Sequence, residues 1–285
     1  MAGAEQKWAV VTGASAGLGA DFARQLAARG WNLILVARRL DRLQALADEI
    51  RNAHRETEIE VIALDLGLPD AGQTLLDRAT TRNRHVQALV NNAGFGIYGP
   101  FEQIEWQRQT EMLTLNIVRL TELCWLFARH MRGHGQPAHI LNVGSMAAFQ
   151  PTPYFSAYGA TKSYVRNFTE ALAWEFRETN VKVTLFSPGA TRTEFSDVAG
   201  INIPKAFEGA QMDSPHVVRL ALEGMLAGKV EVVPGFLNLL TGVSSRLLPR
   251  KLLARAAVFT MGGRKTMRQT FTPPPTNDLP RDQEP

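Results

Sequence analysis

Residues 7–19 read Lys7-Trp8-Ala9-Val10-Val11-Thr12-Gly13-Ala14-Ser15-Ala16-Gly17-Leu18-Gly19. The stretch 7–12 is a short apolar run that suits a buried parallel strand, and helical periodicity begins directly after the last glycine. A helix N-terminus offers free N–H groups and a partial positive charge to a pyrophosphate, and glycines let the backbone come close to it. The stretch therefore predicts a dinucleotide site made by Gly13, Ser15, Ala16, Gly17, Leu18 and Gly19.

The rest of the chain alternates between strand and helix patterns. Six more strands are expected at 32–37, 59–64, 88–91, 139–143, 181–186 and 230–233, and further helical patterns occupy roughly 40–53, 71–82, 102–132, 155–179 and 213–227. Repeated βαβ units predict an α/β fold, a Rossmann-like doubly wound, seven-stranded parallel sheet with helices on both faces. Its ligand crevice would lie at the carboxyl ends of the strands.

A second pattern concerns Ser145, Tyr158 and Lys162, which stand thirteen and then four residues apart. The last two lie inside a helical pattern, so both side chains project from one face about one turn apart. A free tyrosine has a pKa of roughly 10, and an adjacent ammonium group favours its phenolate. The trio predicts acid–base chemistry on an alcohol or a carbonyl group.

With these motifs the chain resembles the short-chain dehydrogenase/reductase family, in its compact single-domain branch. The matching stretches run in the family's order and spread over residues 7 to about 235: residues 12–19, Asp65-Leu66, Asn91-Asn92-Ala93-Gly94, Asn116, Ser145, Tyr158 with Lys162, and Pro188-Gly189 with Thr191 and Thr193. The resemblance implies a nicotinamide-dependent oxidoreductase.

The resemblance also implies roles for these residues. Ser145 would hydrogen-bond the substrate oxygen and Tyr158 would deliver the proton, while Lys162 would hold the nicotinamide ribose and lower the Tyr158 pKa. Asn116 would anchor a water molecule in a proton relay. The remaining matches are expected to bind the cofactor: Asp65 and Leu66 near the adenine, Asn92, Ala93 and Gly94 beside the ribose, and Pro188, Gly189, Thr191 and Thr193 over the nicotinamide amide and phosphates.

The choice of cofactor depends on Arg38 and Arg39. An NAD site usually carries an acidic residue after the second strand, about 20 residues past the glycines, but no carboxylate occurs here before Asp41. Two arginines at the start of a helix oppose its dipole unless an anion lies between them. Because guanidinium groups suit a phosphate, we expect NADP(H), with a solvated charge pair as the alternative.

The substrate pocket is less clearly specified. Apolar side chains gather after the strand ends and favour a bulky apolar ketone, aldehyde or alcohol: Phe95, Ile97, Tyr98, Met146, Phe149, Tyr154, Phe155 and Phe195. Two alternatives stay open, a 3-oxoacyl thioester reductase of lipid metabolism and a non-enzymatic NADP-binding sensor. A mobile lid is expected over residues 190–214.

Composition limits the class of protein. Hydrophobic residues make up 45% of the 285 residues and charged residues 20%, as in soluble globular proteins. No basic-then-apolar leader, long apolar run or cysteine pair occurs, so we expect a cytoplasmic protein without a membrane span, a metal or a nucleic-acid partner. His130 and His134 form the only ligand-like pair and have no carboxylate or cysteine beside them. A homodimer or homotetramer is expected.

The C-terminal region differs from the rest. Residues 1–235 would form the dinucleotide-binding and catalytic domain, 236–268 a helical extension broken at Pro249, and 269–285 a disordered tail. Between positions 229 and 268 there are eight basic residues and one acidic residue. An apolar face with basic flanks predicts one of three roles: packing over the pocket, a subunit contact, or peripheral contact with an anionic membrane.

Overall fold

A single parallel sheet organises the chain. The computed structural model describes residues 6–200, 209, 211–245 and 247–260. Seven strands follow the order β3-β2-β1-β4-β5-β6-β7, and every pairing is parallel. Their bounds are β1 Trp8–Thr12, β2 Asn32–Ala37, β3 Ile59–Ala63, β4 Val86–Asn91, β5 Ala138–Val143, β6 Val181–Phe186 and β7 Glu231–Val232. The doubly wound fold expected from the sequence is confirmed.

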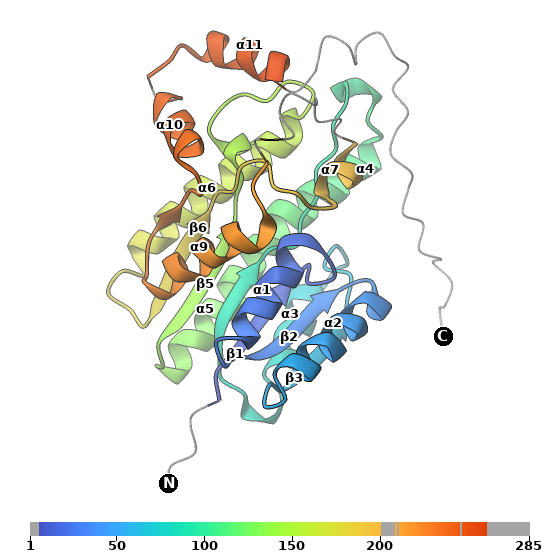
Figure 1. Ribbon diagram of the computed structural model, residues 1–285, viewed down its shortest axis with the longest axis vertical. Helices are drawn as coiled ribbons and strands as arrows, with labels where there is room; N and C mark the ends of the chain where they lie inside the picture. The colour runs from blue at the N-terminus through green and yellow to red at the C-terminus, as the bar shows by residue number, and fades with distance from the viewer. Residues whose placement is uncertain (1–5, 201–208, 210, 246, 261–285) are drawn as a thin grey trace.

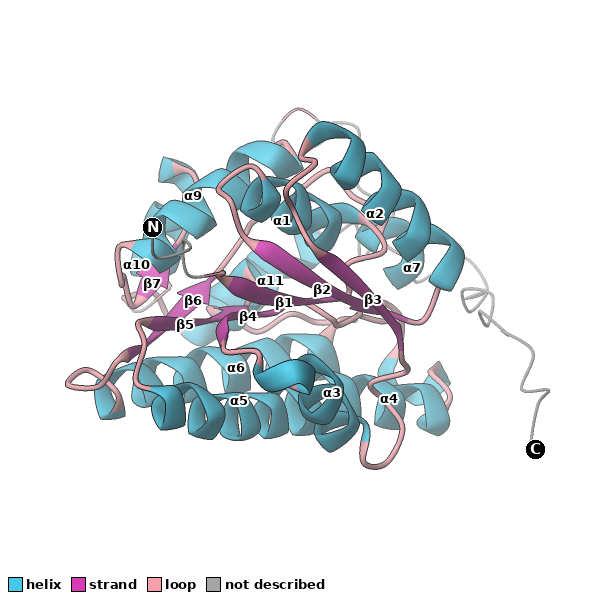
Figure 2. Cartoon of the chain, turned by 90° about the horizontal axis from the view of Figure 1, so that it is seen from below, coloured by secondary structure: helices cyan, strands magenta, loops and turns pink. Residues whose placement is uncertain are grey.

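Helices cover both faces of this sheet (Figure 2). One layer holds α1 Gly17–Ala27, α2 Leu40–Ala53 and α9 Ser214–Leu226, and the other holds α3 Ala71–Ala79, α5 Leu120–His134 and α6 Ser156–Glu175. The strand β1 shows the reason, because Trp8 and Val10 belong to one buried cluster while Ala9 and Val11 belong to the other. Successive side chains of a strand point to opposite faces, so an apolar run needs cover on both.

The helical pattern over 102–132 is not one helix. A 3₁₀ turn at Phe101–Gln103 (η2) leads to α4 Trp106–Leu113, then to a π-helical segment Thr114–Arg119 (η3), which continues into α5. The periodicity of apolar residues does not predict the π segment. Asn116, which lies in it, forms hydrogen bonds with residues distant in sequence, and local periodicity carries no information about such contacts. Other ends moved by a few residues: β4 begins at Val86, and the helix expected to reach 179 ends as α6 at Glu175.

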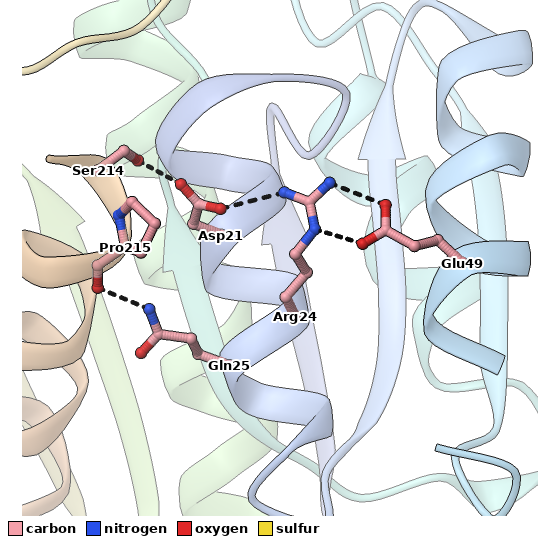
Figure 3. Close-up of polar contacts among 6 residues, drawn as sticks. All are labelled: Asp21, Arg24, Gln25, Glu49, Ser214 and Pro215. Atoms are coloured by element: carbon pink, nitrogen blue, oxygen red, sulfur yellow. Dashed lines mark hydrogen bonds and ion pairs between the residues drawn. The ribbon is translucent and has the colours of Figure 1, made fainter. Parts of the chain in front are cut away.

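Polar contacts hold α1 between its two neighbouring helices (Figure 3). Arg24 donates two hydrogen bonds to the Glu49 carboxylate of α2, at 2.7 and 2.9 Å, and one to Asp21 at 3.1 Å. Hydrogen bonding to Arg24 lowers the pKa of Glu49. On the other side Ser214 of α9 donates to Asp21, and Gln25 donates to a backbone carbonyl of α9. These contacts set the direction in which the N-terminus of α1 points.

The chain continues past the sheet into two more helices, α10 Phe236–Ser244 and α11 Arg250–Thr260, drawn orange and red in Figure 1. The helical pattern breaks before Pro249, as expected. The tail expected to be disordered, 269–285, lies outside the described residues. No helix among the described residues is long and apolar enough to cross a membrane.

Three histidines meet at the amino end of β4. The Val86 N–H donates to His130 Nε2 at 3.1 Å, and His134 Nε2 lies 3.1 Å from the Val86 carbonyl oxygen. The His134 ring stacks on His85, with 5.0 Å between ring centroids. Burial, followed by the two neighbouring imidazoles, lowers the pKa of His130 to about 4. Within the described ranges, no group of three or more His, Cys, Asp or Glu side chains is placed to hold a metal ion.

We therefore expect the free energy of unfolding to fall as the pH drops from about 6.5 toward about 4. In that window the unfolded chain binds a proton on His130 that the folded chain does not. After allowance for partial exposure the loss is on the order of 1 kcal/mol, or roughly 2–4 °C in melting temperature. His130→Gln keeps an acceptor for Val86 and should lose this part of the pH dependence in thermal melts, whereas the exposed His216→Gln should keep it. Identical profiles for wild type and His130→Gln would contradict the assignment.

Candidate active site

The glycine turn lies at the carboxyl end of β1. Gly13 has φ +65° and Gly17 has φ +52°, a backbone region that favours glycine. The residue before α1, Ala16, offers no side-chain cap, so the first N–H groups of the helix have no capping side chain at this end. An uncapped helix start with glycines is the kind of donor set that fits a pyrophosphate.

Close packing explains the third glycine of the turn. A Cβ atom on Gly19 would stand 2.1 Å from the Gly13 carbonyl oxygen and 2.6 Å from Asn92 Nδ2. That amide donates to the carbonyl oxygens of Thr12 and Gly13 at 2.9 and 3.2 Å. The Thr12 hydroxyl accepts from the N–H groups of Asn92 and Ala93 at 3.0 Å each. The segment after β4 therefore braces the turn directly.

Tyr158 and its partners come together as the spacing predicted. Tyr158 projects from α6 and is buried. Ser145, two residues after the end of β5, accepts from the Ala147 N–H at 3.1 Å and is near enough to the Tyr158 phenol to lower its pKa in part. Lys162, one turn further along α6, is also buried and donates to the Val143 carbonyl oxygen at 2.8 Å. The Lys162 ammonium lies 5.7 Å from the centroid of the Tyr158 ring.

The electrostatics of this group differ from the expectation. Burial raises the pKa of the Tyr158 phenol well above its ordinary value, and the hydrogen bond from Ser145 lowers it only in part. Burial also lowers the pKa of Lys162 to about 8. The expectation that Lys162 lowers the Tyr158 pKa is therefore corrected for the protein alone: burial is the largest cause and the net shift is upward, opposed only by Ser145. The phenol is a neutral proton donor at physiological pH.

Asn116 is buried in the π segment η3 and faces the same region. Its Nδ2 donates to the Phe95 carbonyl oxygen at 2.9 Å and to the Thr161 hydroxyl at 3.2 Å, and its Oδ1 accepts from the Phe95 N–H at 3.2 Å. A Cβ atom on Gly94 would stand 2.8 Å from Asn116 Oδ1. Asn116 therefore fixes the wall that follows β4, and π segments of this kind are frequent at functional sites.

An aromatic cluster surrounds the tyrosine. The rings of Phe155 and Phe195 lie 4.2 and 5.5 Å from the Tyr158 ring, centroid to centroid. Six of the eight apolar residues expected at the pocket belong to this cluster: Phe95, Ile97, Tyr98, Tyr154, Phe155 and Phe195. The other two do not; one of them, Phe149, packs against Gly242 of α10 and the Arg166 guanidinium instead.

Two arginines gather at the rim near the start of α2. Arg39 donates to the Ser15 hydroxyl at 3.2 Å and lies 3.6 Å from the Glu194 carboxylate. Arg38 lies 4.0 Å from the Asp65 carboxylate. The structure thus brings Arg39 to the glycine turn and Arg38 to the loop after β3. Glu194 had no signal in the sequence, because it reaches this rim from the loop after β6.

Asp65 and Leu66, two more residues that match the family's motifs, stabilise the loop after β3. Asp65 Oδ1 accepts from the Gly67 N–H at 2.8 Å, so this carboxylate caps the loop that follows it. Leu66 is buried, and its carbonyl oxygen accepts from Arg119 Nε at 2.7 Å. Both residues therefore shape this loop in the protein alone.

The loop after β6 crosses the site. The Pro188 carbonyl oxygen accepts from the Met146 N–H at 3.0 Å, and a Cβ atom on Gly17 would contact the Thr193 side chain at 3.2 Å. A bridge between Thr191 and Met212 closes the base of the segment that follows. Residues 201–208 and 210, within the expected lid, lie outside the described residues. Nothing in the sequence predicted that Asn238 of α10 packs against this loop. A Cβ atom on Gly189 would stand only 2.5 Å from the Asn238 side-chain amide.

The close approach of Gly19 to the Gly13 carbonyl oxygen can be tested by substitution. Gly19→Ala places a methyl group against a backbone carbonyl that cannot rotate away, and such overpacking typically costs about 1–3 kcal/mol. We expect the free energy of unfolding to fall by that amount in chemical denaturation.

The matched control is Gly133→Ala in α5. A Cβ atom there would meet nothing within 4 Å, so this variant should be neutral or more stable by up to about 1 kcal/mol. Equal stability of the two variants would show that the close approach at Gly19 has been misjudged.

Comparison with known proteins agrees with this geometry. A family model described as short chain dehydrogenase matches residues 7–202. The 7beta-hydroxysteroid dehydrogenase of Mediterraneibacter gnavus is 29% identical over 187 residues, 66% of this chain and 70% of that protein. A short-chain dehydrogenase from Sphingobium yanoikuyae, solved in complex with NADPH, is 31% identical with a TM-score of 0.75, over 85% of this chain and 94% of that one. The bulky-bulky ketone specific alcohol dehydrogenase from Comamonas testosteroni is 28% identical with a TM-score of 0.72, over 97% and 100%. The chain therefore belongs to the short-chain dehydrogenase/reductase family.

Proposed function

We propose that the protein is an NADP(H)-dependent oxidoreductase that interconverts a carbonyl and an alcohol on a bulky apolar substrate, with Tyr158 as the acid and base. The observation that carries this proposal is the burial of Tyr158 against the aromatic cluster, with the Lys162 ammonium 5.7 Å from the centroid of its ring. A neutral phenol in an apolar pocket suits proton delivery to a carbonyl oxygen as that oxygen gains negative charge.

Each of the four polar residues has a task in this proposal. Tyr158 donates its proton to the substrate oxygen during reduction, and Ser145 orients that oxygen. Lys162 holds the ribose hydroxyls of the cofactor, and Asn116 anchors a water molecule through which the proton is replaced. The bound cofactor supplies the hydride. In the reverse direction Tyr158 accepts the proton from the alcohol.

The residues at the glycine turn would hold the cofactor. The N-terminus of α1 would bind the pyrophosphate, and Arg38 and Arg39 would bind the 2′-phosphate of NADP(H). Both arginine side chains are partly exposed and lie beside Ser15 and the Asp65 and Glu194 carboxylates, 3.2–4.0 Å away. A phosphate could take over the guanidinium contacts that these carboxylates make now. The Sphingobium yanoikuyae protein in complex with NADPH supports the same choice.

The side chains around Tyr158 indicate the class of substrate. Phe155, Phe195, Tyr98 and Tyr154 place aromatic side chains around Tyr158. Aromatic walls with a few polar groups favour a large apolar ketone, aldehyde or alcohol. Relatives named for a hydroxysteroid and for bulky ketones support this class.

We also infer that the protein forms a homodimer or homotetramer through the outer face of α5 and α6. Large apolar side chains stand exposed on these helices, Trp125 on α5 and Tyr164 and Trp174 on α6. The Tyr164 hydroxyl lies 2.9 Å from the Thr121 hydroxyl, so the two helices share one surface. Exposed large apolar side chains gathered on neighbouring helices favour a contact site.

Tyr158→Phe tests the chemistry. It removes the proton donor alone, so we expect turnover to fall by at least about 10²–10⁴-fold while NADPH binding stays nearly unchanged. The assay is NADPH oxidation over a panel of bulky ketones, aldehydes and 3-oxoacyl thioesters. The matched control is Tyr164→Phe, on the same helix but outside the site, which should keep full activity. Near-normal turnover by Tyr158→Phe would refute the mechanism, and a preference for thioesters would replace the ketone assignment.

Arg38→Ala and Arg39→Ala test the choice of cofactor. Loss of a charge-assisted hydrogen bond to the 2′-phosphate should weaken NADPH binding by roughly 10- to 150-fold per residue, with NADH almost unaffected. Fluorescence titration with both cofactors measures this difference. Arg51→Ala, at the far end of α2, is the control and should change neither affinity. An equal loss for the two cofactors, or tighter binding of NADH by the wild type, would overturn the assignment.

A further inference from the structure

The helix α10 is amphipathic, but its large apolar side chains face away from the protein. Asn238 and Gly242 face the protein: Asn238 donates to the Pro234 carbonyl oxygen at 2.7 Å and lies against Gly189, and Gly242 is buried against Phe149. Its large apolar residues face outward, with 77% of Phe236, 74% of Leu237, 50% of Leu239 and 53% of Leu240 exposed. A helix at the surface of a globular protein normally buries its apolar stripe, so this outward face fits an apolar environment outside the fold.

The apolar surface continues beyond α10. Leu247 is 82% exposed and Leu248 47%, both in the turn before α11, and Leu252 in α11 is 51% exposed. In α11 the inward positions are Leu253 and Ala257, one turn apart and both buried. We name the exposed set the leucine surface: Phe236, Leu237, Leu239, Leu240, Leu247, Leu248 and Leu252.

Basic side chains accompany the leucine surface. Lys251 and Arg255 stand one turn apart on α11 beside Leu252, and all three are exposed, as is Arg250. Between positions 232 and 277 the sequence has seven basic residues and no acidic residue. Exposed apolar side chains and exposed basic side chains therefore occur together on the C-terminal helices, and the segment 232–277 has no carboxylate of its own to neutralise the charges.

We infer that the leucine surface docks on an anionic membrane. Apolar side chains entering the acyl boundary, with lysine and arginine at the headgroups, are the pattern of a helix that lies in the membrane interface. The nine residues of α10 span only about 14 Å, too short to cross a bilayer. A symmetric contact between two copies would instead bring Lys251, Arg255 and their counterparts toward one another, which like-charge repulsion opposes.

The location of this surface gives it a consequence for the site. The inward side of α10 touches Gly189, in the loop after β6, and Phe149, which follows Ser145 by four residues. Docking through the leucine surface would therefore bring this side of the site close to the lipid, where an apolar substrate is concentrated. Only this consequence rests on the proposed function; the membrane contact does not.

Co-sedimentation with vesicles tests the inference. The full chain should bind phosphatidylcholine vesicles that contain phosphatidylserine, bind pure phosphatidylcholine vesicles more weakly, and be released by high salt. Lys251→Gln with Arg255→Gln should weaken binding to the anionic vesicles by about 25-fold, since each basic residue near an anionic surface contributes about fivefold. Leu237→Gln with Leu240→Gln should weaken it by at least about tenfold.

Matched controls lie elsewhere on the molecule. Leu226→Gln on α9 and Arg55→Gln after α2 change an exposed leucine and an exposed arginine, and both variants should bind vesicles as the wild type does. All variants should keep wild-type turnover of a water-soluble ketone without vesicles, which separates this test from that of the catalytic proposal.

Three results would overturn the inference. The first is no binding to anionic vesicles at low salt. The second is binding that neither pair of substitutions weakens relative to its control. The third is a lower oligomeric state of the Leu237→Gln, Leu240→Gln variant in light scattering without vesicles, which would make the leucine surface a contact between copies of this chain.

Discussion

The close approach of α1 to the end of β1 is the contact on which the site depends. With a side chain at Gly19 the helix could not lie against the Gly13 carbonyl oxygen, and Asn92 could not brace both. The position of α1 determines where its N-terminal N–H groups point, and Arg24 and Asp21 tie that helix to α2 and α9. A glycine at one position thereby aligns three elements from distant parts of the chain.

Desolvation governs the chemistry at the other end of the crevice. Tyr158 and Lys162 are both buried, and burial disfavours the charged form of each, so the phenol is held neutral and the ammonium loses its proton more readily. An acid that stays protonated at neutral pH can give its proton to a carbonyl oxygen. In the reaction proposed for Tyr158, the apolar surroundings that would bind the substrate also hold the phenol protonated.

In α10 a small contact face toward the protein leaves the large apolar side chains exposed. Gly242 and Asn238 let α10 lie close to Phe149 and Gly189, and that contact needs no leucine. The apolar side chains of α10 are therefore available for a surface outside the fold, and α11 adds the positive charges. Because α10 packs against the loop after β6, this one helix connects the leucine surface to a loop that borders the candidate active site.

Local patterns in the sequence determined much of this protein. Strand and helix alternation predicted the seven strands and their carboxyl edge, since periodicity reports which faces are buried, and the spacing of Tyr158 and Lys162 predicted one shared helix face. The π segment at Asn116, the bracing by Asn92 and the reversed face of α10 came only from tertiary structure. Each depends on a partner distant in sequence. The direction of the Tyr158 pKa shift likewise required knowing how deeply the phenol is buried, because desolvation is the largest cause of that shift.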